Sequence, residues 1–159
     1  MYKYILLALF VSACTYSTPY GDCFGAFIKA VDLGTDMTNV DPLAGCPNET
    51  VTASSLVRAD GVYTTNCAFS GCHGGNNTVF NAKTAADLSA LVDMASTQTN
   101  KMPIVTAGKP EQSYLIYKLN GLQVFADGSG KYMPVSLSGL LPKTDRCKFI
   151  NWIKQGAKE

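Results

Sequence analysis

The stretch NCAFSGCHGG, residues 66–75, constrains this chain more than any other part of its sequence. It places two of the six cysteines and the only histidine within seven residues, and two glycines follow the histidine. Four residues separate Cys67 from Cys72, and His73 comes directly after the second cysteine. Any fold of this chain must therefore hold two thiols and one imidazole close together.

Three chemistries without haem use a cluster of this kind. Zinc usually needs four ligands, and the chain has no second Cys/His pair to complete such a site. A disulfide between Cys67 and Cys72 is reasonable in an oxidising compartment, with His73 as a solvated bystander. A nucleophilic Cys/His pair is less favoured there, because a reactive thiol beside another cysteine tends to oxidise.

Covalent attachment of a c-type haem is the interpretation that the residue order favours. It needs two thiols for the vinyl groups and an imidazole directly after the second thiol, and His73 meets that requirement. The usual spacing has two residues between the cysteines, whereas this chain has four. Gly71 can ease the turn into Cys72, but the longer connection leaves open whether both thioethers form.

A sixth ligand to haem iron must be something other than histidine, because His73 is the only one in the chain. Methionine is a common partner of histidine at such iron centres. Two Met-Pro pairs compete for this position, Met102-Pro103 and Met133-Pro134. The second lies in an irregular, glycine-containing stretch just before the last predicted helix, where the backbone is free to present a thioether.

The N-terminus has the pattern of an export signal. Lys3 is followed by a short apolar run and then by small residues ahead of Cys14, and the run is too short to span a bilayer. The tetrad VSAC resembles the lipobox of bacterial lipoproteins, in which the cysteine becomes the acylated first residue. That resemblance implies a signal peptide over 1–13, lipidation at Cys14 and a bacterial cell envelope. Because Thr15 is not an aspartate, we expect the outer membrane or the periplasmic face.

Composition indicates one globular domain with an N-terminal extension. The chain has 159 residues, 47% of them hydrophobic, which is enough to bury a core around a cofactor. Its 13 Lys and Arg nearly balance its 12 Asp and Glu, and no basic stripe is present. We therefore expect no nucleic-acid partner.

Apolar periodicity and end signals predict four helices joined by long irregular loops. Pro110 suits the first position of one helix, and Gly121 and Gly156 suit the residues just past helix ends. Thr84 and Asp87 form a candidate capping pair. The expected helices cover residues 23–34, 84–96, 109–121 and 142–156. A flat porphyrin would give the long loops something to wrap.

Four segments in order then resemble a known family. NCAFSGCHGG, AGKPEQSYLIYKL, KYMP and FINWIKQGA are similar to segments of bacterial cytochrome c-like lipoproteins related to the planctomycete cytochrome c domains. The resemblance covers about residues 51–158. It implies a mainly α, class I cytochrome c-like fold in 51–159, preceded by an anchor, tether and extension over 14–50. It also implies one covalent haem c on Cys67 and Cys72, with His73 proximal and Met133 distal, and leaves Met102 as packing.

The same resemblance bears on the remaining cysteines. With Cys14 lipidated and two thiols used by haem, Cys23, Cys46 and Cys147 remain. In the family, the segment before the haem site packs against the final helix, which implies a disulfide between Cys46 and Cys147. A Cys23 to Cys46 disulfide is the next alternative, and three small buried thiols are the last.

The function that follows from these expectations is single-electron transfer without catalysis. A six-coordinate haem with a His/Met pair leaves no open site for a substrate and favours reduced iron. Partners would be other redox proteins or a membrane-bound electron-transfer complex. Two alternatives stay open: a haem sensor or peroxidase-like protein with an open distal site, and a haem-free lipoprotein that disulfides stabilise for structure or binding.

Overall fold

The computed structural model of the protein describes residues 41–75, 80–135 and 139–159. The expected signal peptide, Cys14, Cys23 and the expected helix over 23–34 all lie outside these ranges. Residues 41–159 form one compact unit.

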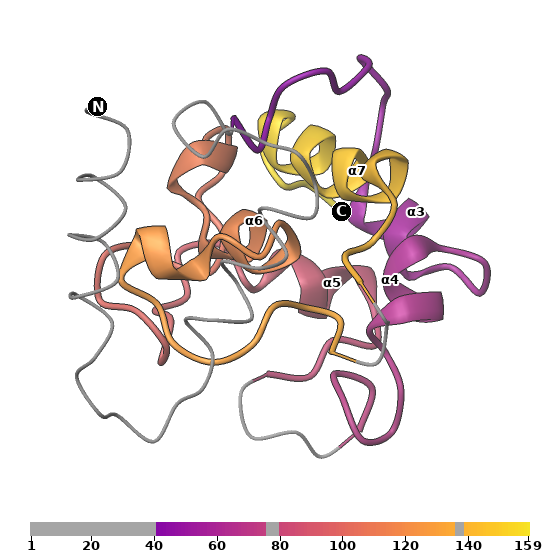
Figure 1. The fold of residues 1–159 in the computed structure, drawn as a ribbon. Helices are drawn as coiled ribbons and strands as arrows, with labels where there is room; N and C mark the ends of the chain where they lie inside the picture. Colours follow the sequence, from indigo (N-terminus) through magenta and orange to yellow (C-terminus); the bar gives the residue numbers. More distant parts are fainter. Residues whose placement is uncertain (1–40, 76–79, 136–138) are drawn as a thin grey trace, which may run out of the picture. The chain divides into compact units, whose positions relative to one another are not determined.

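Short helices and long irregular connections make up the described part of the chain (Figure 1). It contains no sheet, only isolated bridges that pair Val92 with Val105 and Ala95 with Pro103. The expectation of a mainly α protein is therefore confirmed. The helices are α3 (Ala53–Val57), α4 (Val62–Asn66), α5 (Ala85–Ser89), η2 (Pro110–Gln112), α6 (Tyr114–Leu119), η3 (Gln123–Ala126) and α7 (Lys143–Lys154).

Helix α7 is the long helix expected at the C-terminus, and it supplies the centre of the core. Its apolar face is fully buried: Trp152 and Ile153 have no exposed surface, and Phe149 and Ile150 have 1% each. Gly156 follows the helix with a φ of 93°, a left-handed conformation that glycine adopts without strain. This end of α7 therefore forms as the sequence predicts.

The chain end returns to α3. The indole nitrogen of Trp152 donates to the carbonyl of Lys158 at 2.8 Å, and the backbone amide of Ala53 donates to the same oxygen at 3.0 Å. Figure 1 shows the C-terminus lying beside α3 and α7. This shared acceptor ties the start of the helical unit to its last helix.

The N-terminal pair of helices was not predicted from the sequence. Helices α3 and α4 have five residues each, too short to show a clear apolar period. A capping box starts α3, in which Thr52 and Ser55 each accept from the other's backbone amide. Helix α4 leads directly into Cys67, so it places the first thiol.

The predicted helix over 84–96 is wrong beyond Ser89. The capping pair of Thr84 and Asp87 is confirmed as a capping box, but α5 ends after five residues. Asp93 has a φ of 57°, and its amide donates to the carbonyl of Val105 at 2.8 Å. Pairing with residues 103–105 thus replaces the helical hydrogen bonds after Leu91.

The predicted helix over 109–121 forms as two pieces. Pro110 begins the short helix η2, and the Ser113 side chain then donates to the carbonyl of Lys109 at 2.9 Å and accepts from the amide of Thr106. Helix α6 starts afterwards. Its first two amides donate to the carbonyls of Pro103 and Ile104. Ser113 therefore interrupts the helix by bonding to backbone groups.

Cys46 and Cys147 are joined by a disulfide, the pairing that the family resemblance implied. The bond closes a loop of 101 residues, for which the chain-entropy model gives a stabilisation of about 4–5 kcal/mol. Two more contacts hold the same segment on α7: Asn151 donates to the carbonyl of Pro47, and Gln155 to that of Glu49. Residues 46–51 therefore follow α7 ahead of the first helix.

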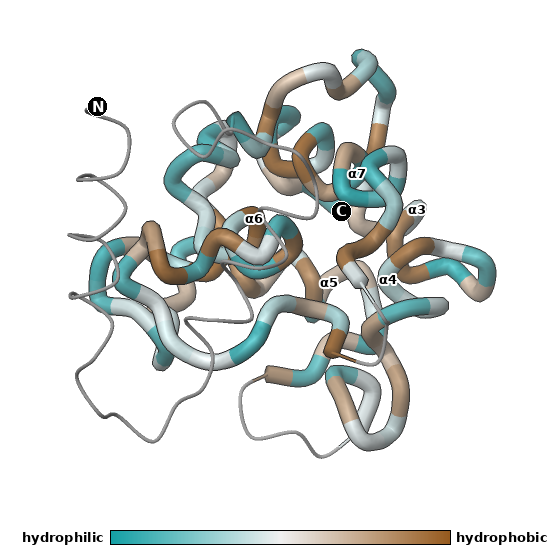
Figure 2. Tube along the Cα trace, viewed as in Figure 1, coloured by the Kyte–Doolittle hydropathy of each residue, from teal (hydrophilic) through white to brown (hydrophobic). Residues whose placement is uncertain are grey.

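Hydrophobic and hydrophilic residues alternate along the helices, as Figure 2 shows for α6 and α7. Among the described residues, no helix is both long and apolar enough to cross a membrane.

Candidate functional site

The segment from Cys67 to His73 is folded into a compact loop. The amide of Cys72 donates to the carbonyl of Phe69 at 2.8 Å, and that of His73 donates to the carbonyl of Cys67 at 3.0 Å. The second bond ties the histidine back to the first cysteine. Phe69 is 49% exposed, so the four residues between the cysteines form an outward bulge while both ends of the motif stay together.

Position 74 must be glycine because the backbone of Ala68 passes too close for a side chain. A Cβ atom on Gly74 would lie 1.9 Å from the carbonyl oxygen of Ala68, far inside any contact distance. At Gly71, by contrast, an added Cβ would meet nothing within 4 Å. The glycine after His73 therefore lets the bulge close, whereas the glycine before Cys72 is not needed for space.

His73 is held in one orientation by Phe80. Its Nδ1 lies 3.0 Å from the backbone oxygen of Phe80, and the two rings stack with centroids 4.1 Å apart and planes 13° from parallel. Because a carbonyl oxygen can only accept, Nδ1 carries the proton and Nε2 keeps its lone pair. An imidazole that binds metal through Nε2 needs this tautomer. The N–H of Nδ1 then usually donates to a carbonyl or carboxylate oxygen, as it does here.

Cys67 and Cys72 are half-buried free thiols in the structure. Burial, with a smaller contribution from the neighbouring Cys72, raises the pKa of Cys67 to about 12. A thiol with so high a pKa is a poor nucleophile near neutral pH, because only the thiolate attacks. This environment disfavours a nucleophilic Cys/His pair.

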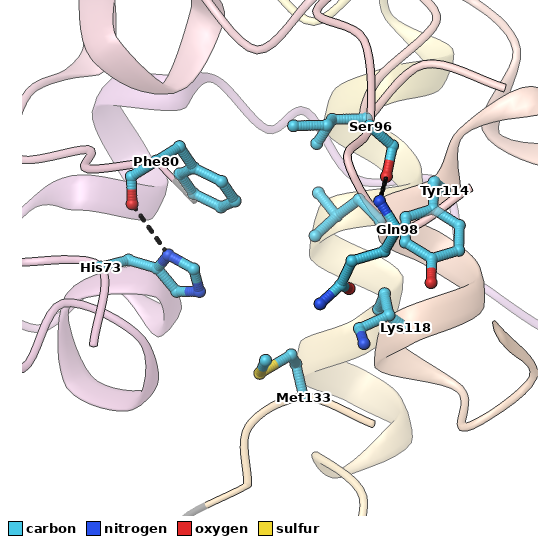
Figure 3. Close-up of a pocket in the computed structure, with 9 residues that line it drawn as sticks. His73, Phe80, Ser96, Gln98, Tyr114, Lys118 and Met133 are labelled. Carbon is cyan, nitrogen blue, oxygen red and sulfur yellow. Dashed lines mark hydrogen bonds between the residues drawn. The ribbon is translucent and has the colours of Figure 1, made fainter. Parts of the chain in front are cut away.

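A pocket opens between His73 and Met133 (Figure 3). The open space at this site is about 480 Å³, a volume that includes solvent. Three parts of the chain face the histidine across it: the segment after α5, helix α6 and the loop before α7. The lining residues are His73, Phe80, Ser96, Gln98, Ile104, Tyr114, Leu115, Lys118 and Met133.

Met133 reaches the pocket from an irregular loop. Its amide donates to the carbonyl of Lys118 at 3.0 Å, which ties the loop to the end of α6. Figure 3 shows the thioether directed into the space that His73 faces from the other side. Met102 is half-buried and does not line this pocket. Of the two Met-Pro pairs, only the second brings its methionine to the candidate site.

The remaining predicted residues lie elsewhere. The disulfide of Cys46 and Cys147 supports α7 and does not line the pocket. Sequence reasoning missed Phe80 and Lys118. A signal for Lys118 was present, because it follows Tyr114 by four positions and Leu115 by three, and so shares their helix face.

The donor set of this pocket fits a c-type haem. The His73 imidazole, with its Nε2 lone pair free, and the Met133 thioether line one cavity. The thiols of Cys67 and Cys72 come shortly before His73 in the chain. Apolar side chains such as Ile104 and Leu115 complete the lining. Among the described residues, no three His, Cys, Asp or Glu side chains form a group able to hold a metal ion.

Comparison with known proteins adds nothing to this description. No protein-family model, no curated protein and no solved structure matches the chain. Function must therefore be argued from the side chains of the pocket and their chemistry.

Gly74→Ala is expected to strain the loop that carries the thiols and the imidazole. The added methyl group must displace the backbone of Ala68, at a cost of about 1–3 kcal/mol in the free energy of unfolding. Gly71→Ala is the matched control, and its stability should stay equal or rise by up to about 1 kcal/mol. Denaturant titration followed by circular dichroism measures both. Equal stabilities for the two variants would contradict the loop geometry.

Proposed function

We propose that this protein is a lipid-anchored, mono-haem c-type cytochrome that carries single electrons between redox partners at the bacterial envelope. The observation that carries the proposal is that His73, which directly follows Cys72, lines the same pocket as Met133. A class I cytochrome c-like arrangement of the helices belongs to the same proposal. The family resemblance of the four sequence segments also supports it.

Each of the site residues has a defined task in this proposal. Cys67 and Cys72 would hold the haem through thioethers, and His73 and Met133 would be the axial ligands. The bound haem would supply one-electron chemistry at its iron. The Phe80 carbonyl holds the proton of the neutral His73 ring on Nδ1, so Nε2 is the nitrogen that would bind metal.

Electron transfer is favoured over catalysis because both axial positions have a protein ligand available. The backbone amide of Met133 donates to the carbonyl of Lys118, so helix α6 helps to fix the position of the thioether. A soft thioether stabilises reduced iron and raises the reduction potential. Partners would be redox proteins, or a membrane-bound electron-transfer complex, that dock through small and transient contacts.

The first prediction is that the mature chain carries one covalent haem. After expression with a cytochrome c maturation system, denaturing electrophoresis with haem staining should show one band. The band should vanish in Cys67→Ala/Cys72→Ala, and a band that remains in a single variant shows that the other cysteine forms its thioether across the four-residue gap. A colourless wild-type protein would instead favour the haem-free, disulfide-stabilised alternative.

Met133→Ala should open the sixth coordination site. Loss of the thioether would turn the ferric haem toward high spin and lower its potential, because water stabilises reduced iron less well. Met102→Ala is the matched control, since Met102 is half-buried outside the pocket, and it should cost at most about 2 kcal/mol of stability with no spectral change. Absorption spectra decide between them. An unchanged spectrum in Met133→Ala would point to an open distal site in the wild type, and so to the sensor or peroxidase-like alternative.

Attachment to the membrane is proposed to come from lipid at Cys14. Replacement of Cys14 by Ser should abolish acylation and move the protein to the soluble fraction, because the acyl chains dominate its membrane affinity. Fractionation of cells that express each form measures this. Continued membrane retention of Cys14→Ser would indicate a protein partner or an uncleaved signal in place of the lipid.

A further inference from the structure

Lys118 is a buried cation at the edge of the candidate site. It lies near the end of α6, lines the pocket, and is only 5% exposed. Its Nζ donates to the backbone oxygen of Ser129 at 3.2 Å and lies 5.8 Å from the centroid of the Tyr114 ring. Figure 3 shows the ammonium group ending in the pocket beside the Gln98 amide.

No acidic side chain in the described parts of the chain forms an ion pair with Lys118. The three ion pairs there join Arg58 to Asp60, Lys101 to Asp127 and Lys148 to Asp145. Burial lowers the pKa of Lys118 to about 8, which still leaves the amine mostly protonated at neutral pH. A buried charge is costly unless an opposite charge faces it.

The contact with Ser129 does not account for this charge. Tyr114 already donates its hydroxyl to the same carbonyl oxygen at 3.2 Å, so the loop is held there without an ammonium group. The residues that line the pocket include no aspartate or glutamate. Lys118 and Gln98 therefore present hydrogen-bond donors to a space whose protein walls offer no anion.

We propose that the Lys118 ammonium binds a carboxylate of the molecule that fills this pocket. The inference rests on the proposed function: a haem brings two propionate carboxylates, and Lys118 would pair with one of them. A charge-assisted hydrogen bond of this kind is stronger than one between neutral groups. Lys118 would thus fix the rotation of the porphyrin in the pocket, in addition to the thioethers and axial ligands.

The test uses the haem-loaded full chain with isotopically labelled propionates. Cells fed carboxyl-labelled 5-aminolevulinate make such a haem, and redox-difference infrared spectra identify the carboxylate bands by their isotope shift. Lys118→Met should move one labelled band to the position of a solvated carboxylate and lower the midpoint potential. Lys118→Arg keeps the charge and should preserve both. Lys154→Met, which alters an exposed lysine on α7, is the matched control and should change neither.

Identical labelled bands in wild type and Lys118→Met would overturn the inference while leaving the haem itself in place. A chain without covalent haem shows no labelled band at all, and that result refutes the proposed function. Should Lys118→Met not mature, Lys118→Gln replaces it. Failure of both neutral variants, with Lys118→Arg maturing normally, would also support a required positive charge.

Discussion

The hydrogen bond from His73 to the Phe80 carbonyl is the interaction on which the candidate site depends. The chain has one histidine, so no other residue can supply an imidazole. The bond fixes the proton on Nδ1, and ring stacking on Phe80 fixes the plane of the ring. Phe80 thus orients the one imidazole of the chain through both its backbone oxygen and its ring. Without these contacts, the ring would rotate and either nitrogen could bear the proton.

Support for this loop comes from helix α7 at some distance in the sequence. The disulfide from Cys46 and the hydrogen bond from Asn151 hold the first described segment on α7, and the C-terminus is tied to α3 through Lys158. Helix α3 packs on α4 and α5, and α4 runs into Cys67. These long-range links therefore hold together helices that are mostly short and joined by long irregular segments.

Strong local signals predicted the helix ends that formed as expected, whereas non-local pairing explains why one predicted helix stopped early. The apolar face and Gly156 predicted the position of α7, and the Thr84/Asp87 capping pair predicted the start of α5. The helix expected beyond Ser89 did not form because the amide of Asp93 donates to the carbonyl of Val105, and the amide of Ile104 donates to that of Met94. A search for local periodicity cannot detect these partners, which lie ten or more residues away. His73 and Met133 were found from their residue types and neighbours. Phe80 was missed because its backbone oxygen, rather than its side-chain type, performs the task.

Lys118 links the two sides of the pocket. Its carbonyl accepts from the amide of Met133, while its ammonium group ends in the cavity beside Gln98. One residue therefore holds the thioether loop through its backbone and presents a positive charge through its side chain. Since a buried positive charge and a thioether both favour reduced iron, their placement on a single residue and its hydrogen-bonded neighbour would raise the potential together. In the proposed cytochrome, helix α6 would then be the element that tunes the potential of the haem.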